Sequence, residues 1–243
     1  MAIDDAIATT RWGLFVKRLL SRVELAVLAY YKRNPAERIG LRVVKEVYSG
    51  EAPSWAILFG RAQPILFSPG ELLNLWQQVR ILKDHGGAFA EVGAFKGDSA
   101  EVACRAKGNR QFYVFEAFAG LPSPSGMVDA RFRKGLFASA EDQLRRRLSQ
   151  YPNTTIVAGY FPETAACVFD EQFSYVHLDL DLYEPTLAAL GFFYPRMLPG
   201  GRLIIHDYSQ CEGVWQAVSE FVSDKPEGIE PMALTQGVIT KLP

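Results

Sequence analysis

The hydrophobic residues follow a helical period in the first part of the chain and alternate between strand and helix patterns in the rest. Apolar residues within 11–32 recur every three to four positions, which predicts a helix. Residues 68–71 combine an N-cap candidate, a proline suited to the first helical position and an acid, so a second helix is predicted from here to residues 86–87. Residues 1–85 are therefore predicted to form an N-terminal helical arm.

Beyond residue 86 the chain alternates between predicted strands and predicted helices. Strands are predicted at 88–94, 111–115, 154–158, 175–180 and 202–205, and helices at 98–107, 141–149, 186–194 and 213–222. This alternation predicts an α/β fold with a doubly wound, Rossmann-like parallel sheet over residues 86–243. The last two strands, at 229–234 and 238–242, have no helix between them, so one of them must be antiparallel. Residues 121–136 are an irregular insertion, which is typical of a lid or substrate loop.

Composition and charge then narrow the class of protein. The 243 residues are 49% hydrophobic and carry 26 Lys and Arg against 27 Asp and Glu, a net charge of −1. This excludes a disordered chain and argues against a protein that binds nucleic acid through overall basic charge. The three widely spaced cysteines form neither a zinc ribbon nor a disulfide framework. With no apolar run near the length of a membrane span and no signal-peptide pattern, a cytoplasmic location is expected.

A glycine-bearing turn follows the first strand of the predicted sheet. Its sequence, EVGAFKGDS over 91–99, lacks the second glycine of the dinucleotide fingerprint, and Glu91 stands two residues before Gly93. A carboxylate there would repel a pyrophosphate but could accept a hydrogen bond from an ammonium. Glu116 ends the next strand, about 20 residues further on, where an acid binds ribose hydroxyls in nucleotide sites. Together these features predict a nucleoside ligand with a cationic tail.

A second group of polar residues follows two later strands. His177, Asp179 and Asp181 alternate along one predicted strand and would share a face, while the next strand ends in His206-Asp207. If the two strands are neighbours, Asp179, Asp181, His206 and Asp207 meet at one crevice. Several uncompensated carboxylates in a half-buried place are costly, and a hard divalent cation would offset that cost.

These residues lie within a stretch that resembles a known family. From residue 89 to residue 242 the chain resembles a class I S-adenosylmethionine-dependent methyltransferase, and more closely the macrocin and mycinamicin type of antibiotic sugar O-methyltransferase. The matching segments are AEVGAFKGDSAEVA at 90–103, FEAFAGLP at 115–122, GYFPET at 159–164 and VHLDLDLYEPTLAALGFFYPRMLPGGRLIIHDY at 176–208. The resemblance implies a seven-stranded methyltransferase sheet in which the terminal strand pair is antiparallel.

The resemblance also implies roles for individual residues. It places S-adenosylmethionine at Glu91, Gly93, Phe95, Gly97, Ser99, Glu116, Ala117, Phe118 and Gly159. It places a divalent ion, usually magnesium, at Asp179, His206 and Asp207, and makes Asp181 the general base for the acceptor hydroxyl. The family usually has two aspartates where this chain has His206-Asp207, and imidazole suits softer metals than magnesium. A different metal, or none, therefore remains open, with His206 as a second candidate base.

The function implied is O-methylation of a hydroxyl on a small glycoside, assisted by a divalent metal, by a homo-oligomer engaged in antibiotic biosynthesis. The alternatives are a metal-independent methyltransferase that uses His206 or Asp181 as base, a nicotinamide-dependent oxidoreductase and a non-catalytic cofactor-binding domain. The arm is predicted to be an oligomer interface or a substrate wall. The basic residues of the insertion, Arg131 among them, are either contacts to an anionic substrate or a solvated surface.

Overall fold

The computed structural model describes residues 66–67, 69–232 and 234–243. The helix predicted over 11–32, and the rest of the predicted arm up to residue 65, lie outside the described residues.

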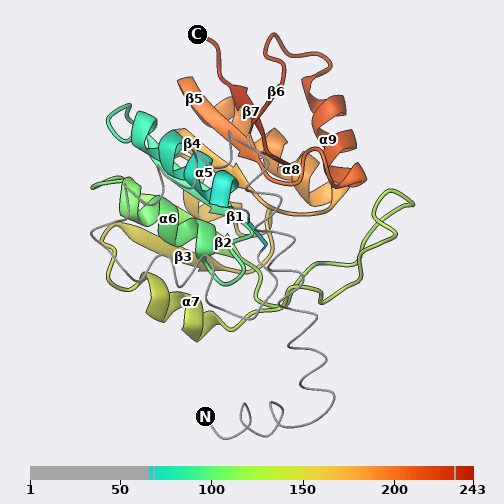
Figure 1. Ribbon diagram of the computed structural model, residues 1–243, viewed down its shortest axis with the longest axis horizontal. Helices are drawn as coiled ribbons and strands as arrows, with labels where there is room; N and C mark the ends of the chain where they lie inside the picture. Colours follow the sequence, from blue (N-terminus) through green and yellow to red (C-terminus); the bar gives the residue numbers. More distant parts are fainter. Residues whose placement is uncertain (1–65, 68, 233) are drawn as a thin grey trace, which may run out of the picture. The chain divides into compact units, whose positions relative to one another are not determined.

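Seven strands in the described residues form one mixed sheet in the order β3-β2-β1-β4-β5-β7-β6 (Figure 1). The strands are β1 Ala88–Val92, β2 Phe112–Glu116, β3 Thr154–Ala158, β4 Phe173–Leu178, β5 Met197–Ile205, β6 Glu230–Pro231 and β7 Gly237–Thr240. The first five strands pair in parallel, and β7 pairs antiparallel with both β5 and β6. The predicted fold class, including the antiparallel terminal pair, is confirmed.

The helices pack in two groups. They are α5 Pro69–Leu82, α6 Asp98–Ala106, α7 Glu141–Leu148, α8 Tyr183–Phe193 and α9 Glu212–Val222, with short 3₁₀ segments at Ala165–Val168 and Tyr194–Arg196. Helix α6 contacts α5 and α7, whereas α8 contacts α9. Crossovers between parallel strands are right-handed, and the chain moves in opposite directions from β1 to β2 and from β4 to β5. The α6 and α8 crossovers therefore cover opposite faces of the sheet.

The two central strands form the middle of the core. Every residue of β1 and of β4 is buried, as expected for parallel strands covered on both faces. Aromatic rings extend this core, with the ring centroids of Phe161 and Phe193 5.2 Å apart and those of Phe173 and Phe193 5.0 Å apart. The ionisable residues within these strands are Glu91, Tyr175 and His177, and all three are fully buried.

Element boundaries differ from the prediction where strands meet the loops at their carboxyl ends. Strand β1 ends at Val92 and β4 at Leu178, each two residues earlier than predicted. Gly93 and Asp181 adopt left-handed backbone conformations, with φ of 90° and 62°, which turn the chain out of the sheet. Asp179 and Asp181 therefore lie in the β4–α8 loop and not on the strand in line with His177. The predicted strand over 229–234 is reduced to β6.

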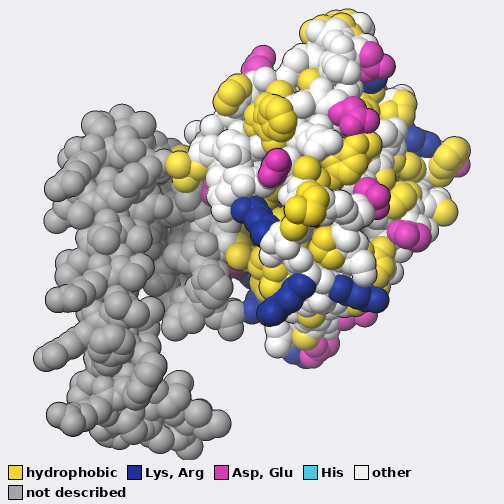
Figure 2. Space-filling model, turned by 90° about the vertical axis from the view of Figure 1, so that its right-hand side faces the viewer, with side chains coloured by type: hydrophobic (Ala, Val, Ile, Leu, Met, Phe, Trp, Pro, Cys, Tyr) yellow, Lys and Arg dark blue, Asp and Glu magenta, His cyan; other side chains and the backbone are white. Residues whose placement is uncertain are grey.

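The surface carries charges of both signs. Figure 2 shows hydrophobic side chains spread over one face of the described part, with basic and acidic side chains among them. This mixture agrees with the net charge of −1. Among the described helices, none has the length and apolar character that crossing a bilayer requires.

Candidate functional site

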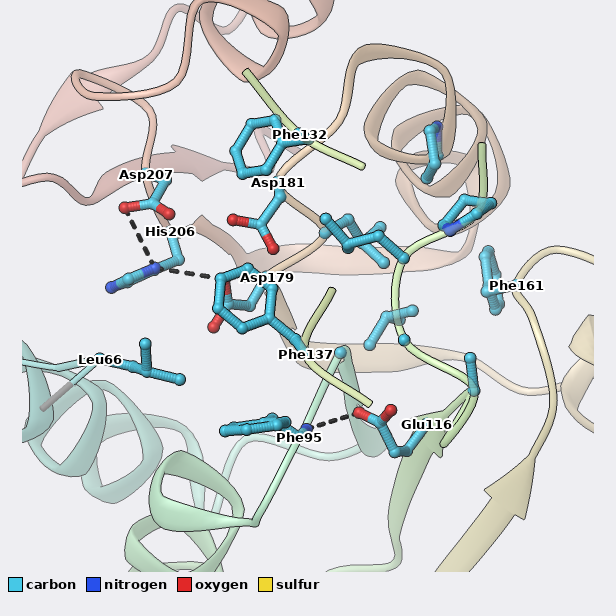
Figure 3. Close-up of a pocket in the computed structure, with 18 of the residues that line it drawn as sticks. Leu66, Phe95, Glu116, Phe132, Phe137, Phe161, Asp179, Asp181, His206 and Asp207 are labelled. Carbon is cyan, nitrogen blue, oxygen red and sulfur yellow. Dashed lines mark hydrogen bonds and ion pairs between the residues drawn. The ribbon is translucent and has the colours of Figure 1, made fainter. Parts of the chain in front are cut away.

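A cavity of about 600 Å³ opens at the carboxyl ends of the parallel strands. This is the edge of an open α/β sheet at which ligands bind. Aromatic rings make up much of its wall, as Figure 3 shows, and they include Phe95, Phe132, Phe137 and Phe161. Most of the predicted site residues line it, namely Gly93, Phe95, Glu116, Ala117, Gly159, Asp179, Asp181, His206 and Asp207.

The two glycines of the β1–α6 turn allow close contact between protein segments. A Cβ at Gly93 would collide with the backbone oxygen of Asp179, and one at Gly97 would collide with the Leu144 side chain. Both glycines also have a positive φ, a backbone conformation that residues other than glycine rarely adopt. Glycine is therefore needed here for packing against the β4–α8 loop and α7, whereas the sequence suggested close approach of a ligand.

The cavity wall does not include four of the predicted cofactor residues, namely Glu91, Gly97, Ser99 and Phe118. The Ser99 hydroxyl donates a hydrogen bond to Glu91 Oε1, and both side chains are buried. His177 Nδ1 lies 3.5 Å from the same oxygen. Among the described residues, Glu91 Oε2 is buried without a hydrogen-bond partner. A cationic group would satisfy this oxygen.

Glu116 presents a fixed carboxylate at the end of β2. Its Oε2 accepts a hydrogen bond from the Phe95 backbone N–H at 2.5 Å, and its Oε1 accepts one from the Phe118 N–H at 2.9 Å. Burial raises the pKa of Glu116, while these backbone hydrogen bonds favour its ionised form. Each oxygen still has accepting capacity, so the side chain can receive hydrogen bonds from a pair of hydroxyls.

The predicted cluster of ionisable side chains is present because β4 and β5 are neighbours. Backbone hydrogen bonds continue the sheet beyond the strand ends, from Asp179 N to Val92 O and from His206 N to Leu178 O, each 2.9 Å long. His206 Nδ1 lies 3.2 Å from Asp179 Oδ1 and 3.4 Å from Asp207 Oδ1 (Figure 3). The potential ligand atoms of these three side chains all lie within 4.8 Å of one another.

The charges in this cluster shift one another's pKa values. Burial alone would lower the pKa of His206, but its contacts with Asp179, Asp207 and Glu71 outweigh burial and raise it. Burial, followed by repulsion from Asp179 and Asp207, raises the pKa of Asp181 to about 8. Burial would also raise the pKa of Asp207, but its contact with His206 lowers it. These shifts favour a protonated imidazole beside a carboxyl group whose pKa is raised; a bound metal ion would reverse the first preference, because a ligating imidazole nitrogen must be unprotonated.

Several residues of the site had no sequence signal of their own. Glu71 Oε1 lies 3.6 Å from His206 Nε2, although its position in the sequence indicated only a helix start. Arg131 was one of several basic residues in the insertion, and the structure places it alone of that group in the cavity wall. There its guanidinium donates a hydrogen bond to Cys211 Sγ at 2.6 Å. Only the packing of α5 and of the insertion brings these residues to the site.

Comparison with known proteins identifies the family. The family model described as Macrocin-O-methyltransferase (TylF) matches residues 71–233. The chain belongs to this family. It is therefore an S-adenosylmethionine-dependent methyltransferase, and the resemblance noted in the sequence is confirmed. The match includes the β1–α6 turn, Glu116 and the insertion. It also includes the acidic cluster, which comprises Asp179, Asp181, His206 and Asp207.

Relatives of this methyltransferase come from Streptomyces. Over 185 residues the chain is 30% identical to the 8-demethyl-8-(2,3-dimethoxy-alpha-L-rhamnosyl)-tetracenomycin-C 4'-O-methyltransferase of Streptomyces olivaceus, covering 67% of this chain and 71% of the relative. Over 124 residues it is 27% identical to the demethyldecarbamoylnovobiocin O-methyltransferase of Streptomyces niveus, covering 46% of this chain and 47% of the relative.

Solved structures share the fold. The O-methyltransferase NovP aligns with a TM-score of 0.66 and 21% identity, covering 78% of this chain and 88% of NovP. The calicheamicin methyltransferase CalS11 aligns with a TM-score of 0.64 and 19% identity, covering 85% of this chain and 93% of CalS11.

Proposed function

We propose that this S-adenosylmethionine-dependent methyltransferase methylates a sugar hydroxyl of a small glycoside in antibiotic biosynthesis. One observation carries the proposal: a single cavity has Glu116 on one side and the Asp179, Asp181, His206 and Asp207 cluster on another. Glu116 suits a nucleoside, and the cluster of ionisable side chains can activate a hydroxyl. The Streptomyces olivaceus relative, whose name specifies a rhamnosyl group, supports a sugar as the acceptor.

The residues around Glu116 fit the cofactor. The Glu116 carboxylate is held by two backbone N–H groups and can accept hydrogen bonds from ribose hydroxyls. Gly93, Phe95 and Gly159 complete this part of the cavity wall, and we retain Glu91, which lies outside that wall, as a candidate partner for the cofactor's ammonium. When bound, S-adenosylmethionine would supply a methyl group on a sulfonium, and the acceptor oxygen would attack the methyl carbon in line with the bond to sulfur. Positioning of the reactants therefore accounts for most of the catalysis.

Asp181 is the proposed general base. A sugar hydroxyl must lose its proton as its oxygen attacks, and a base is most effective when its pKa lies near the working pH. The Asp181 carboxylate lines the cavity and has a pKa of about 8. It can therefore take a proton near neutrality.

We propose that Asp179, His206 and Asp207 hold a divalent ion. The separations between Nδ1 and the two carboxylate oxygens fit a common metal ligand set. Such an ion would polarise the acceptor hydroxyl. One imidazole with two carboxylates suits a transition metal better than magnesium, which prefers oxygen alone. The metal-independent alternative also has support, because a protonated His206 already offsets part of the carboxylate charge.

Residues 121–136 are proposed to contact the acceptor, since Leu121, Pro122, Arg131 and Phe132 line the cavity. Assembly into a homo-oligomer and a cytoplasmic location stay predictions, as does the expected lack of nucleic-acid and membrane partners.

The proposal is tested with purified enzyme, methyl-labelled S-adenosylmethionine and an aryl rhamnoside, with the free aglycone and free rhamnose as matched controls. Product analysis by mass spectrometry and NMR should locate the label on a sugar oxygen of the rhamnoside. Transfer to the aglycone or to an amine in place of the sugar would contradict the proposal.

A further inference from the structure

Glu71 lies between two parts of the site that are far apart in the sequence. It stands in the first turn of α5 and is only 4% exposed. Its Oε1 accepts hydrogen bonds from the Thr235 backbone N–H at 3.2 Å and from the Thr235 hydroxyl at 2.6 Å. The same oxygen lies 3.6 Å from His206 Nε2. The β6–β7 connection therefore fixes a carboxylate that faces the histidine.

A row of buried polar side chains on α5 holds Glu71 in this place. Glu71, Asn74 and Gln78 are spaced three and four residues apart, so they lie on one face of the helix. Asn74 Nδ2 donates a hydrogen bond to Gln236 Oε1 at 2.7 Å, and Gln78 Nε2 donates one to Asn74 Oδ1 at 2.9 Å. Arg202 of β5 in turn donates a hydrogen bond to Gln78. Directional contacts thus fix the helix against β5 and the β6–β7 connection.

The two nitrogens of His206 face different carboxylates. Nδ1 faces Asp179 and Asp207, whereas Nε2 faces Glu71. Among the described residues, Nε2 has no partner at hydrogen-bond distance, and the Glu71 carboxylate lies 3.6 Å from it. The ring itself packs against Phe67, with the centroids 4.3 Å apart. Phe67 therefore restrains the plane of the ring, and Glu71 faces the edge that points away from the cluster.

We propose that Glu71 is a positioning residue that orients His206, with Nδ1 directed to the divalent ion. The inference rests on the metal site of the proposed function. A histidine that binds a metal through one nitrogen commonly donates its other N–H to a carboxylate, which fixes the ring and makes the ligating nitrogen more basic. Glu71 is placed to do this from outside the ligand set. Thr235 supports it by fixing the carboxylate.

The test is calorimetric titration of the full-length protein with Mn²⁺. Glu71→Gln keeps the shape of the side chain and removes its charge, so Mn²⁺ affinity should fall about 10- to 100-fold. The matched control is Glu101→Gln, which makes the same change at a buried glutamate that pairs with Arg105 and Arg147. That control should keep wild-type Mn²⁺ affinity, whatever its effect on melting temperature.

A second variant keeps the inference testable if Glu71→Gln does not fold. Thr235→Val removes the hydroxyl hydrogen bond to Glu71 and should weaken Mn²⁺ binding in the same direction, by about 2- to 10-fold. It should also change the visible spectrum of the Co²⁺-loaded protein, which a purely structural role would leave unaltered. Wild-type affinity in both variants would overturn the role of Glu71 while the metal site stands. Failure of the wild-type protein to bind any divalent ion would overturn the metal site, and the inference with it.

Discussion

Asp179 and Asp181 belong to one short motif but differ in environment. Asp179 contacts His206, and its backbone N–H continues the pairing of β4 with β1. Asp181 has left-handed backbone geometry and lies where burial and two neighbouring carboxylates raise its pKa to about 8. Their different surroundings support the different tasks that we propose for them, with Asp179 as ligand and Asp181 as base.

Asp181→Asn should lower turnover by about 10²- to 10⁴-fold, which is the contribution typical of a general base. Cofactor affinity should change little, because Asp181 lies in the acidic cluster and Glu116 holds the nucleoside side. In the wild type, kcat/KM should rise with pH until Asp181 is deprotonated, and a divalent ion at the neighbouring ligands should move that rise to lower pH. The variant should lose this rise.

Initial rates measured over the pH range of this rise, together with calorimetric binding of S-adenosylhomocysteine, would check both expectations. Near-normal turnover in the variant would remove Asp181 from the mechanism.

The acidic cluster could be predicted from sequence because its residues follow neighbouring parallel strands, so their position depends on local patterns and one topological rule. Glu71 could not be predicted, and Arg131 could not be told apart from the other basic residues of the insertion, because only the packing of α5 and of the insertion brings these two residues to the cavity. The glycines of the β1–α6 turn were predicted as a site feature, but the packing that requires them involves the β4–α8 loop and α7, which the local sequence does not show.

At the scale of elements, the insertion is anchored to the start of α8. Asp129 is 1% exposed, and its Oδ2 accepts a hydrogen bond from the Tyr183 backbone N–H at 3.0 Å. A Cβ at Gly213 would collide with Asp129 Oδ1, so the start of α9 lies against the same carboxylate. A carboxylate is favourable at a helix N-terminus because unpaired N–H groups and the helix dipole point toward it. Asp129 thus fixes the loop that carries Arg131 and Phe132.

Asp129→Ala should destabilise the protein by about 1–2 kcal/mol, the usual loss for a helix-capping carboxylate. The insertion should become more sensitive to limited proteolysis, and KM for the acceptor should rise more than kcat falls. Denaturant unfolding and proteolysis within residues 121–136 would measure these effects.

Asp142→Ala is the control for this variant. It removes an acid from the first turn of α7, where the Asp142 side chain is 64% exposed. A loss of stability and protease resistance as large as in Asp129→Ala would argue against a specific anchor.

The order of strands and helices was predictable because the buried strands are short, mostly apolar runs that alternate with longer segments of helical pattern. The ends of these elements were harder to predict. The termination of β1 and β4 depends on left-handed residues at Gly93 and Asp181, and α8 starts at Tyr183 beside Asp129, three residues before the predicted start. The short 3₁₀ segments have too few residues to show a period.

At the scale of the molecule, Glu227 joins the C-terminal end of the chain to the end of α8. Glu227 accepts hydrogen bonds from the Tyr194 hydroxyl, from Lys241 Nζ at 3.0 Å and from the Leu242 N–H at 2.9 Å. Burial would raise its pKa, but these hydrogen bonds outweigh burial and lower the pKa from 4.5 to about 2. The folded protein therefore favours the ionised form.

Because this pKa is lowered on folding, its contribution to stability is present above about pH 4.5 and is lost as the pH falls toward 2. Glu227→Gln should cost about 2 kcal/mol of unfolding free energy at pH 7, and the difference from wild type should narrow as the solution is acidified. Urea unfolding at a series of pH values would measure it, with the exposed Glu230→Gln as control. A difference that does not vary with pH would refute this account.

The contact between Gly93 and the Asp179 carbonyl has a further consequence for the molecule as a catalyst. The turn beside the proposed cofactor site and the loop that carries the proposed base touch without a side chain between them. In the proposed reaction the donor half and the acceptor half are therefore mechanically coupled, because a shift of either backbone segment is passed directly to the other. The distance that the methyl group must travel is then set by contact of backbone with backbone.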